Sequence, residues 1–215
     1  MLINANLPFD LEHLSHKDQT LSFAGMSWAD YEKFDSEEYP GYRVSYFNGV
    51  ITLVSPSQNH EVIAEVINYL IVAYCKHIQL LYYPMRSTRL VNKPLAGKEP
   101  DVSFSFGSRK ELPDLAVEVI FSSGSINDLK KYLALGVSEV WFLRMETLPS
   151  RELVPHSRWQ DDRLAFYRLT AGEYVEVANS VCLPDLASKE LASFVNRGFA
   201  ESPLTIKSDF IKSLQ

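Results

Sequence analysis

The sequence predicts an α/β (α+β) fold, in which helices flank a mixed central sheet and a β-hairpin lies near the N-terminus. The hairpin is predicted by Asn48-Gly49, which joins two β-rich runs at 43–47 and 50–54, as in a type I′ turn. A long amphipathic helix is predicted at 58–78. Further on, a strand, a helix and a strand follow one another within about thirty residues, which favours a right-handed parallel crossover.

The N-terminal part is predicted to be a loose extension followed by a short helix. Residues 1–25 show no clear periodicity, and we interpret them as an N-terminal arm. Ser27 is typical of an N-cap and predicts a helix at 28–34, with Asp30 near its start. A loop is predicted at 35–41, directly before the hairpin.

The helix at 58–78 carries an apolar stripe with helical spacing, formed by Ile63, Val66, Ile67, Leu70, Ile71 and Tyr74. At about 100° per residue, His60 lies roughly 60° from the centre of this stripe. We therefore expect His60 to lean inward and Glu61 to point away.

The remaining chain is predicted to alternate between strands and helices. Strands are predicted at 80–83, 88–91, 101–106, 115–120, 139–143, 164–169 and 174–177. Helices are predicted at 127–135, which ends at Gly136, and at 186–195. The segment 145–162 is charged and irregular. We expect one domain at 26–197 and a frayed tail at 198–215.

Composition limits the possible functions. A chain of 215 residues is long enough for one domain with a substantial core. The net charge of −6 argues against a broad nucleic-acid footprint, although not against an enzyme whose carboxylates hold a metal. No apolar run is long enough to span a bilayer, and no signal peptide is evident. Cys75 and Cys182 lack metal-binding spacing, which favours reduced thiols and a cytoplasmic location.

Two carboxylates lie within predicted strands. Asp101 follows Glu99-Pro100, and Glu118 lies within the apolar run at 115–120. A buried carboxylate costs several kcal/mol unless it is paired, protonated or bound to a metal. A divalent-cation site is one interpretation. The alternative is that both carboxylates pair with Arg86, Arg89 or a lysine and only hold the strands together.

Several motifs in order resemble the Uma family of putative restriction endonucleases over roughly residues 26–195. They are Tyr-x-x-Gly (46–49), Ser-Pro-Ser-x-x-His (55–60), Glu-Pro-Asp-Val (99–102), Pro-Asp-Leu-Ala-Val-Glu-Val (113–119) and Gly-Val-Ser-Glu-Val-Trp-Phe (136–142). The resemblance implies a restriction-endonuclease-like fold of the PD-(D/E)xK type. It also implies phosphodiester hydrolysis with Mg²⁺ or Mn²⁺, held by Asp101, Glu118 and the backbone carbonyl of Val119.

The lysine of the PD-(D/E)xK pattern is missing. Ile120 occupies its position two residues after Glu118. The resemblance implies a replacement lysine four residues before Tyr132, but this chain has Asp128 there. Lys130 could reach around the flank of the helix. Lys131 is expected to point to solvent. Either the lysine has moved to Lys130 or the site lacks one.

Three further residues are candidates for the site. His60 could contact a metal-bound water or a phosphate, or it could be a packed residue at a helix edge. Arg86 and Arg89 could bind phosphate bidentately, or they could form surface ion pairs.

The expected function is a metal-dependent endonuclease acting on nucleic acid, with DNA as the expected substrate. Asp101 and Glu118 would bind the metal, and Lys130 or His60 would assist the water. One alternative is a catalytically impaired nuclease-fold protein that binds nucleic acid or a partner protein. Another is a small-molecule metal hydrolase. A homodimer is expected because two-fold dimers are the commonest oligomers, and no membrane partner is expected.

Overall fold

A computed structural model describes residues 18–34, 41–120, 127–144 and 163–215. Residues 1–17 of the predicted arm lie outside this part, as do most of the predicted loop at 35–41 and the charged segment 145–162. Among the described residues, no helix is long and apolar enough to cross a membrane.

The described strands form two sheets. The N-terminal sheet has the order β1 (Gln19–Ala24), β3 (Val50–Ser55), β2 (Arg43–Phe47), β6 (Ala96–Lys98) and β5 (Leu90–Asn92). The central sheet has the order β11 (Glu173–Val177), β10 (Arg163–Thr170), β9 (Glu139–Arg144), β8 (Leu115–Ile120), β7 (Val102–Phe106) and β4 (Tyr82–Pro84). The mixed α+β class is confirmed, and the predicted hairpin forms β2 and β3 of the N-terminal sheet.

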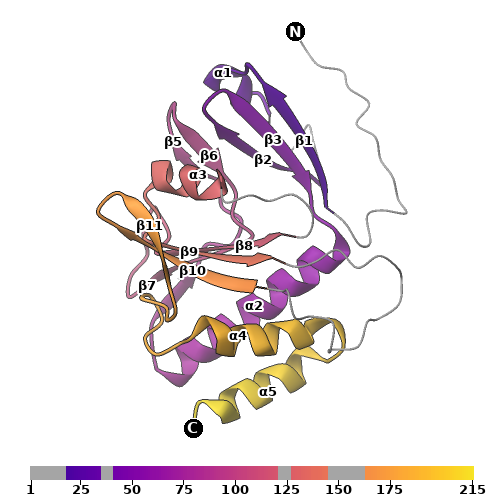
Figure 1. Cartoon of the computed structure of the whole chain (residues 1–215), viewed down its shortest axis with the longest axis vertical. Helices are drawn as coiled ribbons and strands as arrows, with labels where there is room; N and C mark the ends of the chain where they lie inside the picture. The colour runs from indigo at the N-terminus through magenta and orange to yellow at the C-terminus, as the bar shows by residue number, and fades with distance from the viewer. Residues whose placement is uncertain (1–17, 35–40, 121–126, 145–162) are drawn as a thin grey trace.

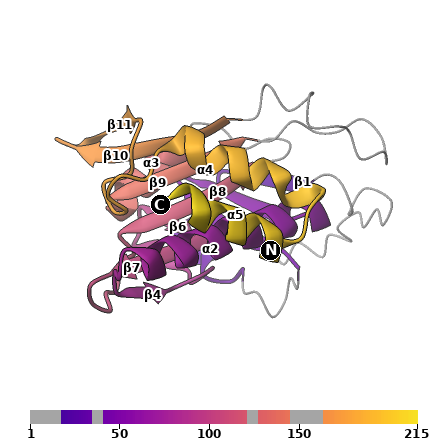
Figure 2. The same ribbon diagram turned by 90° about the horizontal axis from the view of Figure 1, so that it is seen from below.

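The helices and the two sheets are stacked in layers (Figure 1). The helices α2 (Gln58–His77), α4 (Ser188–Val195) and α5 (Pro203–Ser213) cover one face of the central sheet. The N-terminal sheet and α3 (Asn127–Leu135) lie on the opposite side. Figure 2, seen from below, shows the three covering helices side by side in front of the sheet. The main core lies between α2 and the sheet, where Trp141 and Phe166 stack with ring centroids 4.1 Å apart.

The strongest local signals are confirmed. Ser27 and Asp30 form a capping box at the start of α1 (Trp28–Tyr31). Asn48 and Gly49 both have positive φ, 47° and 79°, as the type I′ hairpin requires. β8 and β9 pair in parallel, with α3 between them along the chain, as expected for a crossover unit.

Two predictions of local structure were wrong, and one strand was missed. Residues Gln19–Ala24 of the predicted arm form β1, which pairs with β3 because Leu21 and Phe23 pack onto the core of the N-terminal sheet. Ala96–Lys98 forms β6, although no strand was predicted there. The predicted frayed tail at 198–215 contains the end of the 3₁₀-helix η2 (Asn196–Phe199) and all of α5. Ile206 and Phe210, one turn apart on α5, are fully buried.

Candidate functional site

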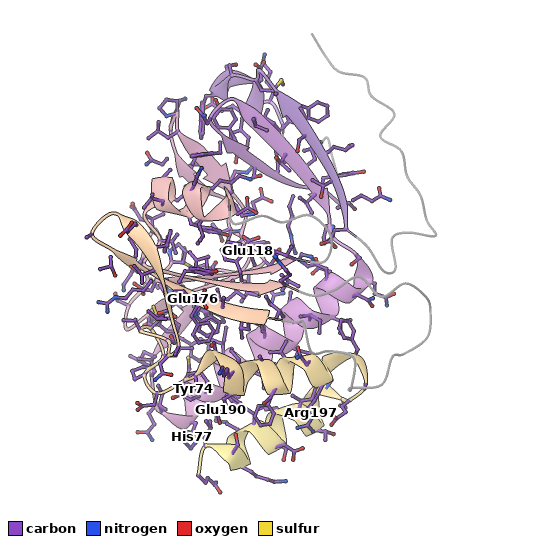
Figure 3. All side chains as sticks on the ribbon, in the orientation of Figure 1. Tyr74, His77, Glu118, Glu176, Glu190 and Arg197 are labelled. Carbon is purple, nitrogen blue, oxygen red and sulfur yellow. The ribbon has the colours of Figure 1, made fainter. Side chains whose placement is uncertain are left out.

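A pocket of about 460 Å³ is lined by residues of both sheets, of the start of α2 and of α3. Figure 3 shows Glu118 on the side of the central sheet that faces the N-terminal sheet. The structure brings Asp101, Glu118, Val119, His60 and Lys130 together in the lining of this pocket. These residues are spread over 71 positions of the sequence, and the packing of helices and strands makes them neighbours.

Asp101, directly before β7, is bound by three groups. Its Oδ1 contacts the Arg43 guanidinium and lies 3.0 Å from Nε2 of His60. Its Oδ2 accepts a hydrogen bond of 2.6 Å from the backbone N–H of Val119. This last bond ties Asp101 to the residue after Glu118, so it fixes the two carboxylates relative to each other.

His60 is buried, as expected from its position on α2, and Asp18 orients its ring. Asp18 Oδ2 lies 3.0 Å from Nδ1 of His60, and Asp18 Oδ1 accepts a 2.8 Å bond from the Ser57 backbone. Burial raises the pKa of Asp18, but the hydrogen bond and charge of His60 and the bonds from Ser57 outweigh burial and lower it overall. The sequence analysis missed Asp18 because it placed this residue in a loose arm.

Glu118, on β8, forms an ion pair with a lysine side chain. Lys98 Nζ lies 3.1 Å from Glu118 Oε2, and the Tyr132 hydroxyl donates to Glu118 Oε1. Burial lowers the pKa of Lys98, but the negative charges of Glu118 and Asp128 outweigh it and raise the pKa overall. Burial and the neighbouring Glu118 raise the pKa of Tyr132 well above its ordinary value, so this hydroxyl stays a donor. The sequence analysis did not single out Lys98, because its strand was not predicted.

The expectation for Lys131 was wrong. Its side chain is only 14% exposed, and its Nζ lies 2.8 Å from Asp128 and 3.1 Å from the Ser45 hydroxyl. Burial and the charge of Lys98 lower the pKa of Lys131. Burial raises the pKa of Asp128, but Lys98 and Lys131 outweigh it and lower the pKa overall. Lys130 is exposed at the pocket rim.

Arg86 and Arg89 lie outside the pocket lining. Arg86 is 3.5 Å from Glu65, with a side chain that is 66% exposed. Arg89 pairs with Glu99 at 2.8 Å and lies over the Tyr31 ring. Their role in phosphate binding stays a prediction. The arginine that does line the pocket is Arg43.

The oxygen atoms at this site are of the chemical type that Mg²⁺ binds. Asp101 and Glu118 open onto one pocket and offer hard carboxylate oxygens next to the Val119 backbone. Among the described residues, no group of three His, Cys, Asp or Glu side chains is arranged to hold a metal. Two carboxylates are nevertheless sufficient for Mg²⁺, which keeps several waters and takes further ligands from substrate phosphates. Arg43 and Lys98 would compete with the ion for these oxygens.

The described residues thus form a mixed α+β protein with a charged pocket between its two sheets. The model of the Uma2 family, described as "Putative restriction endonuclease", matches residues 28–204. The chain therefore belongs to the Uma2 family, and the family resemblance found in the sequence is confirmed.

A search of solved structures found a putative nuclease of the DUF820 family from Anabaena variabilis. It is 18% identical, the match covers 79% of this chain and 99% of that chain, and the TM-score is 0.47. A search of curated proteins found no match.

Proposed function

We propose that this protein is a Mg²⁺- or Mn²⁺-dependent endonuclease that hydrolyses phosphodiester bonds of nucleic acid, with DNA as the expected substrate. Its membership of the Uma2 family supports a nuclease. The observation that carries the proposal is the pair Asp101 and Glu118, which line one pocket and are joined through the Val119 backbone. A homodimer and a cytoplasmic location stay predictions.

The roles follow from the contacts. Asp101 and Glu118, with the Val119 carbonyl, would hold the ion, which when bound would lower the pKa of a water and stabilise charge on the phosphoryl group. Val119 N–H and the Arg43 guanidinium donate to Asp101 and orient it. Asp18 accepts from Nδ1 of His60 and thus aims Nε2 at the pocket. His60 is therefore placed to contact a water or phosphate beside Asp101.

Isothermal titration with Mn²⁺ and Mg²⁺ tests the metal site. We expect the wild type to bind Mn²⁺ and Asp101→Ala/Glu118→Ala to lose that binding. Glu65→Ala, which removes an exposed carboxylate on α2, serves as the control and is expected to bind like the wild type. On double-stranded DNA, single-stranded DNA and RNA, we expect metal-dependent cleavage that Asp101→Ala abolishes. Cleavage retained in Asp101→Ala would contradict the proposal.

A second function is a catalytically impaired nuclease fold that binds nucleic acid or a protein. It is favoured by Ile120 and Asp128 at the expected lysine positions, and by the cations that already neutralise both carboxylates. It requires a wild type that cleaves no substrate. Cleavage gained in Asp128→Lys would support it, and robust cleavage by the wild type would exclude it.

A further inference from the structure

Lys98 reaches the site from the sheet opposite the carboxylates. It is the last residue of β6, three positions before Asp101. β6 pairs with β2 through Tyr46↔Gly97 and Phe47↔Ala96. A Cβ at Gly97 would come within 2.3 Å of the Tyr31 hydroxyl, so glycine lets β6 pack closely on the buried Tyr31. This packing fixes the point from which the Lys98 side chain extends.

The Lys98 ammonium lies beside Glu118 and at the pocket. Its side chain is 10% exposed, its Nζ is 3.1 Å from Glu118 Oε2, and it lies 5.9 Å from the centre of the Tyr132 ring. Side chains alternate along a strand, so Ile120 shares the strand face of Glu118, and both line the pocket. The cation absent from position 120 is thus supplied from across the pocket.

The other two lysines in the pocket lining are less suited to supply the cation that is absent from position 120. Lys130 is exposed, and no ion pair joins it to a residue that the structure describes. Lys131 is held by Asp128 and Ser45. Within the described part of the chain, Lys98 is the lysine that contacts a predicted metal ligand.

We propose that Lys98 replaces the missing lysine of the nuclease pattern and contacts the phosphate at which the chain is cut. This inference rests on the proposed function and assigns the charge-stabilising role to a residue outside the family pattern. An ammonium has three donors, so the bond to Glu118 leaves donors for a phosphate oxygen or the attacking water.

The first test compares cleavage rates of Lys98→Met, Lys98→Arg and Lys130→Met under single-turnover conditions. Loss of a positioned charge-stabilising group costs about 100-fold or more in rate, and we expect a loss of this size in Lys98→Met. Lys98→Arg should recover part of it. Lys33→Met, whose side chain is 74% exposed, is the control and should cleave like the wild type. A larger loss in Lys130→Met than in Lys98→Met would overturn the proposal.

The second test is independent of cleavage. Binding of a labelled oligonucleotide is measured with Ca²⁺ in place of Mg²⁺, and intact substrate is verified afterwards. We expect a Kd about tenfold higher in Lys98→Met, because one phosphate contact is lost. If the wild type cleaves nothing, the proposed function fails, and this comparison still decides the role of Lys98. Unchanged affinity in Lys98→Met would overturn the Lys98 proposal alone.

Folding of the variants needs its own control, because Lys98→Met removes the cation that pairs with the buried Glu118. The same comparison is therefore repeated in the Glu118→Gln background, in which residue 118 is uncharged. Lys98→Met is expected to weaken oligonucleotide binding there as well. If it does not, the cation acts only by neutralising Glu118, and the phosphate contact is refuted.

Discussion

Each of the two predicted metal ligands is held by a network of charged and hydrogen-bonding residues. Arg43 bridges Asp101 and Glu61, with NH2 2.7 Å from the exposed Glu61 carboxylate. The guanidinium therefore keeps one partner if a divalent ion takes over Asp101. A carboxylate of this kind is buried at tolerable cost because each of its two oxygens has a donor, and the same donors set its direction.

The Asp18–His60 pair makes stability depend on pH. The pKa of Asp18 is lowered below 3.8 in the folded protein, so its ionised form stabilises the fold above about pH 4, and this contribution disappears as pH falls through the folded pKa. We expect Asp18→Asn to lower the free energy of unfolding by about 1–3 kcal/mol near neutral pH. In urea titrations, this difference from the wild type should shrink toward about pH 2.5.

The exposed Asp185 provides the matched control, because Asp185→Asn removes the same charge from a surface turn. It should change unfolding by less than about 0.5 kcal/mol. A difference between Asp18→Asn and the wild type that stays constant with pH would show that the ionised carboxylate is not what stabilises the fold.

At the scale of elements, neighbours decide the structure of weakly patterned segments. Ala96-Gly97-Lys98 has no β-branched or aromatic residue, yet it forms β6 because β2 and β5 offer backbone partners on both sides. α5 is similar, since its length is marginal for an isolated helix and its stability comes from packing. Ser202 and Pro203 start the helix, and Ile206 and Phe210 attach it to the core.

Phe210→Ala tests whether α5 belongs to the cooperative fold. The Phe210 ring lies 6.2 Å from that of Tyr74 on α2 and 5.2 Å from that of Phe194 on α4. Truncating this fully buried ring should cost about 3–5 kcal/mol, measured by urea denaturation. Leu204→Ala, on the same helix but 74% exposed, should cost less than about 0.5 kcal/mol. Equal effects of the two substitutions would mean that the segment is a frayed tail.

At the scale of the whole molecule, opposite charges face each other across the pocket. Arg43 and Lys98 belong to the N-terminal sheet. Of their partners, Glu118 lies in the central sheet, and Asp101 lies directly before its strand β7. Of the described residues that line the pocket, five are Asp or Glu and four are Lys or Arg. The pocket is thus nearly neutral in a chain of net charge −6 and has little attraction for a polyanion by itself.

Nucleic-acid binding should therefore depend on a divalent ion. We expect oligonucleotide affinity to be at least about tenfold higher with Ca²⁺ than with EDTA, because the added charge offsets the two carboxylates. Fluorescence anisotropy at constant ionic strength measures the difference. In Asp101→Asn/Glu118→Gln, affinity should no longer respond to Ca²⁺. A Ca²⁺ effect that persists in this variant would place the ion elsewhere.

Much of the fold could be predicted because its signals are local. The Asn48-Gly49 turn, the Ser27 cap and the stripe of α2 depend on residues within a few positions of one another, and all were confirmed. The family pattern also placed Asp101 and Glu118 in the same site, which the shared pocket supports. The strands β1 and β6 and the packing of α5 could not be found this way, since their stability comes from partners distant in sequence.

The sequence by itself determined the mixed fold and the family, because periodicity, turn residues and ordered motifs carry this information locally. The tertiary structure alone decided which charged groups surround Asp101 and Glu118. Arg43 reaches Asp101 from 58 positions away, Asp18 reaches His60 from 42 positions away, and Lys98 meets Glu118 across two sheets. Ion pairs of this kind form only where packing brings oppositely charged groups together out of water, and no short-range pattern specifies them.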